Sequence, residues 1–178
     1  MSNAYRGLTK IAWGYVFLHF NLNLGTLNVL PNWAGYLLFF SAIQLLGEDL
    51  RDLPLLKPFC ILLGTAEVIE WLAVLVTGET VLERFFLLHI LVTCINLYFH
   101  FQLLTDLILL AEGQGVSGMH LRMCRNVNVV LGTLMALPLP WSDWGVPGLA
   151  AVVLMLVLWI IITVILIWQL FQLRKVFP

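Results

Sequence analysis

The chain of 178 residues is 61% hydrophobic and 11% charged, and its mean hydropathy is +0.98. Soluble domains carry about 25% charged residues, so this composition excludes a soluble enzyme or a disordered chain and predicts an integral membrane protein. The 9 Lys and Arg residues against 10 Asp and Glu residues leave no basic excess, and we therefore expect no nucleic-acid partner.

Long apolar stretches follow one another along the chain, separated by Gly, Pro and Asn residues that mark turns. A helix needs about 20 apolar residues to cross roughly 30 Å of hydrocarbon. The stretches are apolar on every face rather than alternating, which predicts helices and not a β-barrel. The predicted fold is an all-α integral membrane protein with six transmembrane helices in one domain, 1–178. The expected spans are residues 8–23, 33–46, 55–76, 82–110, 123–137 and 147–173.

A short motif opens the second expected span. Residues 21–47 join an Asn-bearing first helix to the motif Leu-Pro-Asn-x-x-Gly-Tyr, formed by Leu30, Pro31, Asn32, Gly35 and Tyr36. This pattern resembles a family of small, uncharacterised polytopic membrane proteins of Gram-positive bacteria. The resemblance implies a bacterial plasma-membrane location and no particular activity. Physically, Asn32 can cap the second helix, Pro31 can precede it, and Gly35 permits close packing against a neighbour.

The second and fifth spans are expected to be short. Each is roughly 20 Å long, less than the thickness of the hydrocarbon core. They are the middle members of two three-helix halves, and paired short segments at corresponding positions point to a transporter built from inverted repeats. No similarity between individual residues of the two halves accompanies this pattern, so the repeat remains an open question.

Basic residues predict the orientation, because Lys and Arg accumulate in short cytoplasmic segments. Arg84 is the one basic residue in the first, third and fifth connections. All the others flank the chain ends or occupy the second and fourth connections, which requires an even number of spans with both termini in the cytoplasm. These others are Arg6, Lys10, Arg51, Lys57, Arg122, Arg125, Arg174 and Lys175.

Polar side chains interrupt the third and fourth spans. An ionisable side chain at the centre of a membrane costs about 2.5–3.5 kcal/mol on insertion scales, so it indicates a functional site. Glu67 and Glu70 are three residues apart and share one face of the third span. In the fourth span, polar residues recur at helical spacing and draw a continuous stripe. The stripe comprises His89, Thr93, Asn96 and His100.

The first span adds His19 and Asn23, an i, i+4 pair. Depths counted at about 1.5 Å per residue place the polar groups of the first, third and fourth spans in one layer. His100 is expected to lie too close to the cytoplasmic side to join it. The candidate ligand-binding or ion-binding residues are therefore His19, Asn23, Glu67, Glu70, His89, Thr93 and Asn96.

Three interpretations of this layer compete. In the first, it binds or moves a cation, a proton or a small polar solute. In the second, its hydrogen bonds only fasten the helices of an accessory or structural subunit. The least favoured is a metal-dependent intramembrane hydrolase with Glu67, Glu70, His89 and His19 as ligands, because no HExxH motif occurs.

We expect no catalytic residues and no cofactor. The expected partners are the lipid bilayer, a small solute or cation, and either further copies of this chain or a larger membrane complex. The composition does not separate these last two arrangements.

Overall fold

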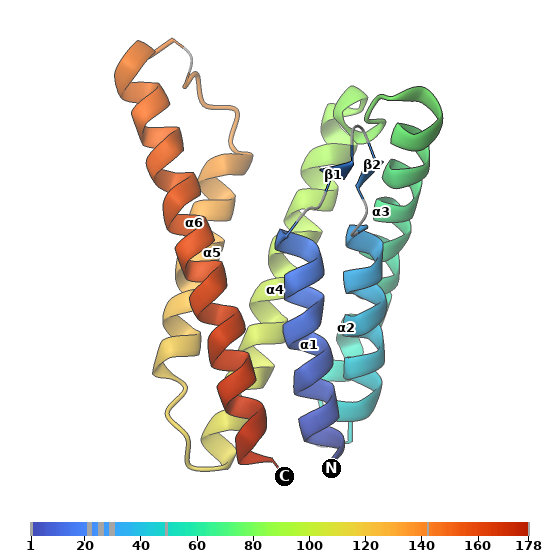
Figure 1. The fold of residues 1–178 in the computed structure, drawn as a ribbon, viewed down its shortest axis with the longest axis vertical. Coiled ribbons are helices and arrows are strands. Elements are labelled where there is room, and N and C mark those ends of the chain that lie inside the picture. The colour runs from blue at the N-terminus through green and yellow to red at the C-terminus, as the bar shows by residue number, and fades with distance from the viewer. Residues whose placement is uncertain are drawn as a thin grey trace.

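The computed structural model describes residues 2–20, 23–24, 27–28, 31–48, 50–141 and 143–177, with the backbone alone for residues 23–24, 27–28 and 83. Six α-helices run up and down through this part of the chain (Figure 1). They are α1 (Asn3–His19), α2 (Asn32–Leu46), α3 (Lys57–Thr77), α4 (Phe86–Gly113), α5 (Met119–Ala136) and α6 (Gly145–Leu173). The prediction of a helical fold is confirmed.

Shorter elements lie between the helices. The two-residue strands β1 (Asn23–Leu24) and β2 (Leu27–Asn28) pair antiparallel between α1 and α2. Single 3₁₀ turns precede α3 and α4 and follow α6. These turns are η1 (Leu53–Leu56), η2 (Leu82–Arg84) and η3 (Arg174–Val176).

Three helical segments are long and apolar enough to cross a membrane. They are Leu53–Thr77, Phe86–Gly113 and Gly145–Val176, whereas α2 is apolar but shorter. The remaining helices, α1 and α5, have 17 and 18 residues and carry more polar side chains. By length and composition, these three helices are able to cross a membrane, whereas α1, α2 and α5 do not meet the same criteria.

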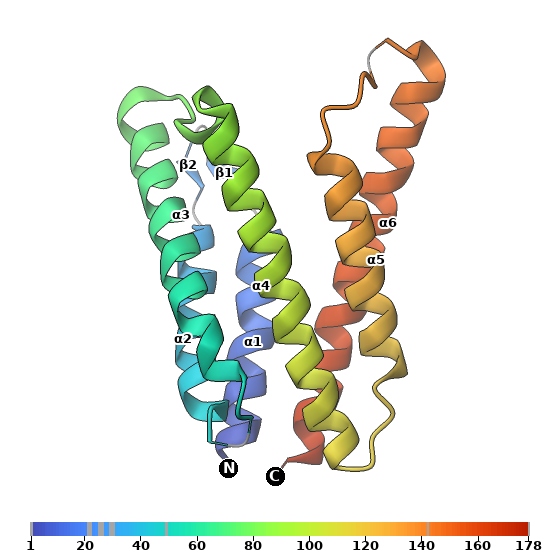
Figure 2. The ribbon, with the colours of Figure 1, turned by 180° about the vertical axis from the view of Figure 1, so that it is seen from behind.

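The helices form a closed ring. Each helix packs against its neighbours in sequence, and α6 packs back against α1. Both chain termini lie at one end of the bundle, together with the α2–α3 and α4–α5 connections (Figures 1 and 2). We call this end the terminal end and the opposite end the far end. The pair α5 and α6 leans away from the other four helices toward the far end (Figure 2).

Close packing of α1 against α2 depends on glycine. A Cβ atom at Gly14 would lie 2.6 Å from the Phe39 ring, and one at Gly35 would lie 2.9 Å from the carbonyl oxygen of Gly14. The close approach predicted for Gly35 is therefore confirmed. These contacts allow the aliphatic side chains around them to form a core in the terminal half, where Leu8, Ile43 and others are fully buried.

Two predictions for the first third of the chain are wrong. Helix α1 ends at His19, because Phe20 leaves the helical conformation, and Asn23 lies in β1. Asn23 is thus not an i, i+4 partner of His19. The residue before α2 is Pro31, and no side chain caps this helix, so Asn32 has another role. Leu30 of the motif lies outside the described residues.

Candidate functional site

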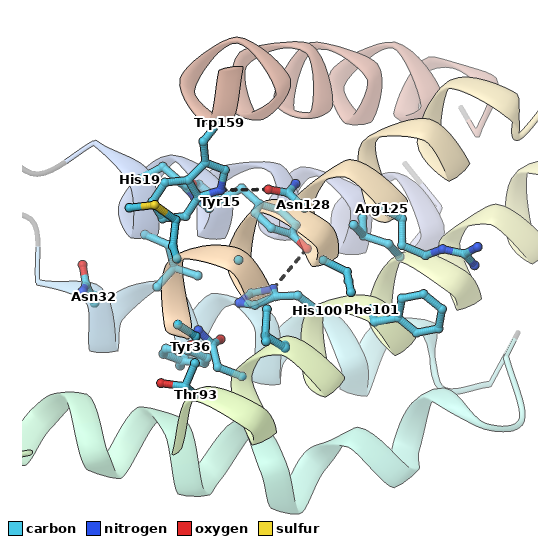
Figure 3. A pocket seen from close by; sticks show the side chains of 18 of the residues that line it. Tyr15, His19, Asn32, Tyr36, Thr93, His100, Phe101, Arg125, Asn128 and Trp159 are labelled. Carbon is cyan, nitrogen blue, oxygen red and sulfur yellow. Dashed lines mark hydrogen bonds between the residues drawn. The ribbon is translucent and has the colours of Figure 1, made fainter. Parts of the chain in front are cut away.

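A cavity of about 330 Å³ lies inside the helix ring (Figure 3). Its volume is at the lower end of the range for ligand pockets. All six helices contribute to its wall, and most of the contributing polar side chains come from α1, α2 and α4. The polar and aromatic lining comprises Tyr15, His19, Asn32, Tyr36, Glu67, His89, Thr93, Asn96, His100, Phe101, Arg125, Asn128 and Trp159.

The carboxylate of Glu67 is held by α2. The Asn32 side chain sits in the first turn of α2 and donates a hydrogen bond from Nδ2 to Glu67 Oε2, with an N···O distance of 3.1 Å. The Asn32 Oδ1 atom is buried and has no hydrogen-bond partner among the described residues. This arrangement orients one carboxylate oxygen with a neutral amide and leaves an amide oxygen unpaired beside it.

A second hydrogen bond joins α2 to α4 one helical turn nearer the terminal end. The Tyr36 hydroxyl donates to Asn96 Oδ1 at 3.0 Å. Asn32 and Tyr36 are four residues apart and lie on the same face of α2. One face of α2 therefore bonds to both α3 and α4 across the cavity wall.

Tyr15 links two histidines. Its hydroxyl is hydrogen-bonded to Nδ1 of His100 at 3.2 Å, and its backbone carbonyl is 3.0 Å from Nδ1 of His19. A carbonyl oxygen only accepts, so Nδ1 of His19 carries a proton and donates it. In the neutral imidazole, Nε2 of His19 is then left as an acceptor.

Helices α5 and α6 close the opposite wall. Trp159 Nε1 donates to Asn128 Oδ1 at 2.9 Å, and the Trp159 ring meets the His19 ring edge to face, with centroids 5.6 Å apart. The absence of a side chain at Gly132 lets α5 approach α4, because a Cβ atom there would lie 2.7 Å from Leu97 Cδ2. Aromatic and amide groups therefore connect α6 to both α1 and α5.

Arg125 lies at the terminal end of the cavity. Its guanidinium lies 4.4 Å from the centroid of the Phe101 ring, and it donates to Thr105 Oγ1 at 2.9 Å and to the side-chain oxygen of Asn126. Figure 3 shows the guanidinium directed away from the cavity centre. The stem of this side chain lines the cavity while its charge is held outside.

Most of the predicted site residues meet in this cavity. The structure brings together His19, Glu67, His89, Thr93 and Asn96. The side chain of Asn23 lies outside the described residues. Five residues of the predicted layer, from α1, α3 and α4, thus line one cavity.

Glu70 does not join the cavity. Its carboxylate accepts hydrogen bonds from the backbone N–H groups of Val81 and Leu82, just before α4. These N–H groups open the 3₁₀ turn η2 and have no helical partner of their own, so an acceptor is needed there. Glu70 therefore holds the α3–α4 connection at the far end.

The exclusion of His100 is wrong. His100 lines the cavity, because the cavity is not a thin layer but follows α4 from His89 to Leu104, about 22 Å at 1.5 Å per residue. The polar stripe of α4 thus contributes all four of its members.

The four proposed metal ligands are not brought together. His19, Glu67 and His89 line the cavity, whereas Glu70 bonds to the α3–α4 connection. Within the ranges that the structure describes, no three His, Cys, Asp or Glu side chains are grouped so as to hold a metal ion. The ligand set predicted for a hydrolase is therefore not formed.

Several lining residues were not predicted. Tyr15 lies four residues before His19, so helical spacing contained a signal for it. Asn128 lies three residues after Arg125, which was expected in the fourth connection, and therefore had no such signal. Asn32 and Tyr36 belong to the recognised motif, where the sequence supported only roles in capping and packing. Trp159 lies in the most apolar helix, and its sequence position does not distinguish it from Trp168 of the same helix.

Comparison of the chain with models of protein families, with curated proteins and with solved structures finds no match. The resemblance to a Gram-positive membrane-protein family stays a prediction. The function must therefore be inferred from the chemistry of the cavity and from its position inside the ring.

Proposed function

We propose that this protein binds a small polar solute in the central cavity and moves it across a membrane. The observation that carries this proposal is that all six helices contribute to one cavity of about 330 Å³ whose wall holds ionisable and amide groups. Polar groups inside a membrane protein are costly unless protein, water or a ligand satisfies them. Because every helix contributes to the cavity wall, a relative movement of the helices changes the access of solute to the cavity.

The proposal includes six membrane-crossing helices with both termini in the cytoplasm of a bacterial cell. Support comes from the alternating helix directions, and from the basic residues, which lie in the terminal half except Arg84. Cytoplasmic segments attract Lys and Arg. The shorter helices α1, α2 and α5 all belong to the ring and contribute to the cavity wall, and a short helix is accommodated by local thinning of the bilayer.

A fastening role is the second candidate, and specific hydrogen bonds favour it. The bonds Asn32–Glu67, Tyr36–Asn96 and Tyr15–His100 each join two different helices. Bonds of this kind contribute about 0.6–2 kcal/mol each between helices in lipid. The two candidates differ in hydration, since a solute site must be reachable by water from at least one side and a fastening layer is dry.

Thiol labelling separates the two candidates, and α4 offers a matched pair of positions. Thr93 lines the cavity, whereas the adjacent Cys94 is exposed and is not part of the cavity lining. In both variants, Cys60 and Cys124 are replaced by Ala. The first variant also carries Thr93→Cys and Cys94→Ala, so its thiol lies at position 93. The second variant keeps Thr93 and the native Cys94. Each is treated in vesicles with a charged methanethiosulfonate reagent, which reacts with thiolates in water.

We expect the thiol at position 93 to be modified at least tenfold faster than Cys94, because the lipid excludes both the charged reagent and the thiolate. A thiol at position 93 that stays unmodified from both sides of the membrane would refute the transport proposal and support the fastening role.

A further inference from the structure

Glu67 has no cationic partner among the residues that the structure describes. Its one hydrogen-bond partner in the described part of the chain is the neutral amide of Asn32. The ion pairs found there are Arg84–Glu79 and Arg122–Glu112, neither of which lies in the cavity. A half-buried carboxylate that is oriented only by an amide is complemented best by a cation from outside the protein.

The hydrogen bonds around Glu67 leave acceptors unpaired. The donors Asn32 Nδ2 and Tyr36 Oη are both used by protein acceptors. Two oxygens beside them have no partner in the described ranges, Glu67 Oε1 and the buried Asn32 Oδ1. The Asn32 oxygen is buried and out of reach of a ligand in the cavity, whereas Glu67 Oε1 is not fully buried and can accept a hydrogen bond from such a ligand. A ligand that fits beside Glu67 must therefore carry positive charge and at least one N–H or O–H donor.

A bare metal ion fits this site poorly. Hard cations take six or more oxygen ligands at about 2.0–2.6 Å, and the described residues hold no cluster of three metal-ligating side chains. The cavity also has room and apolar surface for a carbon skeleton, since the aromatic rings of Tyr15, Tyr36 and Trp159 form part of its wall. Aromatic faces attract organic cations.

Arg125 does not neutralise Glu67. Its guanidinium bonds to Thr105, nine residues along α4 from the Asn96 that receives the Tyr36 hydroxyl. Nine residues correspond to about 13 Å along the helix. The positive group of Arg125 is therefore held by Phe101 at the other end of the cavity, away from Glu67.

We infer that the solute is a small primary ammonium ion, whose N–H groups donate to Glu67 Oε1 and whose carbon chain lies against the aromatic wall. This inference rests on the proposed function and names the class of its solute. Its two requirements, charge and N–H donors, are tested separately with isomeric probes.

The probes are n-butylammonium and tetramethylammonium, which have the same formula and charge and differ in having N–H donors or none. Thermal unfolding of the full-length protein in lipid nanodiscs is followed at increasing concentrations of each chloride salt, with sodium chloride at matched ionic strength. We expect n-butylammonium to raise the unfolding temperature, with an apparent affinity at least tenfold higher than that of tetramethylammonium. Equal effects of n-butylammonium and sodium, or of the two isomers, would overturn the inference.

Two variants assign the effect to the cavity. Glu67→Gln removes the charge and is expected to weaken n-butylammonium binding at least tenfold. Glu70→Gln is the matched control, because its carboxylate lies three residues away on the same helix but bonds outside the cavity, and it should retain the affinity of the parent protein. Retained affinity in Glu67→Gln, or lost affinity in a folded Glu70→Gln protein, contradicts the assignment.

A protection experiment keeps the native Glu67, so its result does not depend on whether a Glu67 variant folds. In the Thr93→Cys protein, bound n-butylammonium should slow the modification of the cavity thiol by the charged reagent, and sodium should not. If the thiol is modified rapidly and n-butylammonium does not slow the reaction, the ammonium inference is overturned but the proposal of a water-filled site stands. Absence of any modification refutes the proposed function itself, so the two failures are distinguishable.

Discussion

The terminal half and the far half of α6 contain the same types of residue but pack in opposite ways. Leu166 in the terminal half is 0% exposed, whereas Leu154 in the far half is 60% exposed. The same contrast holds for the whole bundle, because Leu8 of α1 is 0% exposed and Leu87 of α4 is 80% exposed. Leucine residues therefore occur in both halves, and the neighbouring helices decide which half forms a core.

The two halves also differ in how their helices meet. In the terminal half, α1 and α2 meet through Gly14 and Gly35, and α6 packs against α1. In the far half, α5 and α6 diverge from the other helices. Lipid is expected to cover the apolar surface of that half.

The largest expected effect comes from truncating a core leucine. Leu166→Ala should lower the free energy of unfolding by about 2–5 kcal/mol, because it leaves a cavity in packed surroundings. Leu154→Ala in the same helix should change it by less than about 0.5 kcal/mol. Denaturation in mixed micelles with increasing dodecyl sulfate measures both. Equal losses would show that the two halves are packed alike.

A methyl group at the contact between α1 and α2 is expected to rank second. Gly35→Ala places a Cβ atom 2.9 Å from the Gly14 carbonyl oxygen, and overpacking of this kind costs about 1–3 kcal/mol. Gly113→Ala is the control, since nothing lies within 4 Å of its Cβ position. The same denaturation series applies, and a stable Gly35→Ala protein would argue against close contact between these helices.

A smaller effect is expected at the far end. Glu70→Gln weakens the hydrogen bonds to the backbone N–H groups of Val81 and Leu82, at a cost of about 1 kcal/mol. The α3–α4 connection should then be cleaved faster by an added protease than in Glu79→Gln, where only an exposed ion pair with Arg84 is lost. Unchanged cleavage would mean that Glu70 does not hold this connection.

The smallest expected effect concerns the link between α5 and α6. Trp159→Phe keeps an aromatic ring but removes the N–H that donates to Asn128. Hydrogen bonds between membrane helices average about 0.6 kcal/mol, so the loss of stability should be of that size and should also appear in Asn128→Leu. A double variant that loses no more than either single variant would identify the bond as the shared cause.

The helices themselves were predictable because each is encoded locally. Apolar runs and turn residues located all six, and α6 begins and ends within two residues of the expected span. Helical spacing also predicted that the polar stripe of α4 faces protein or water. Glu67, His89, Thr93 and Asn96 all line the cavity, where His89 is exposed.

Other features depended on how separate helices meet. Glu67 and Glu70 share a helix face, yet one lines the cavity and the other bonds to the α3–α4 connection, because Glu70 lies one turn nearer the point where the chain reverses. The spacing of residues along one helix predicts which face a side chain lies on, but not which group of another helix it contacts. The pairing of Asn32 with Glu67 and the inclusion of His100 were therefore decided only by the tertiary packing of the ring.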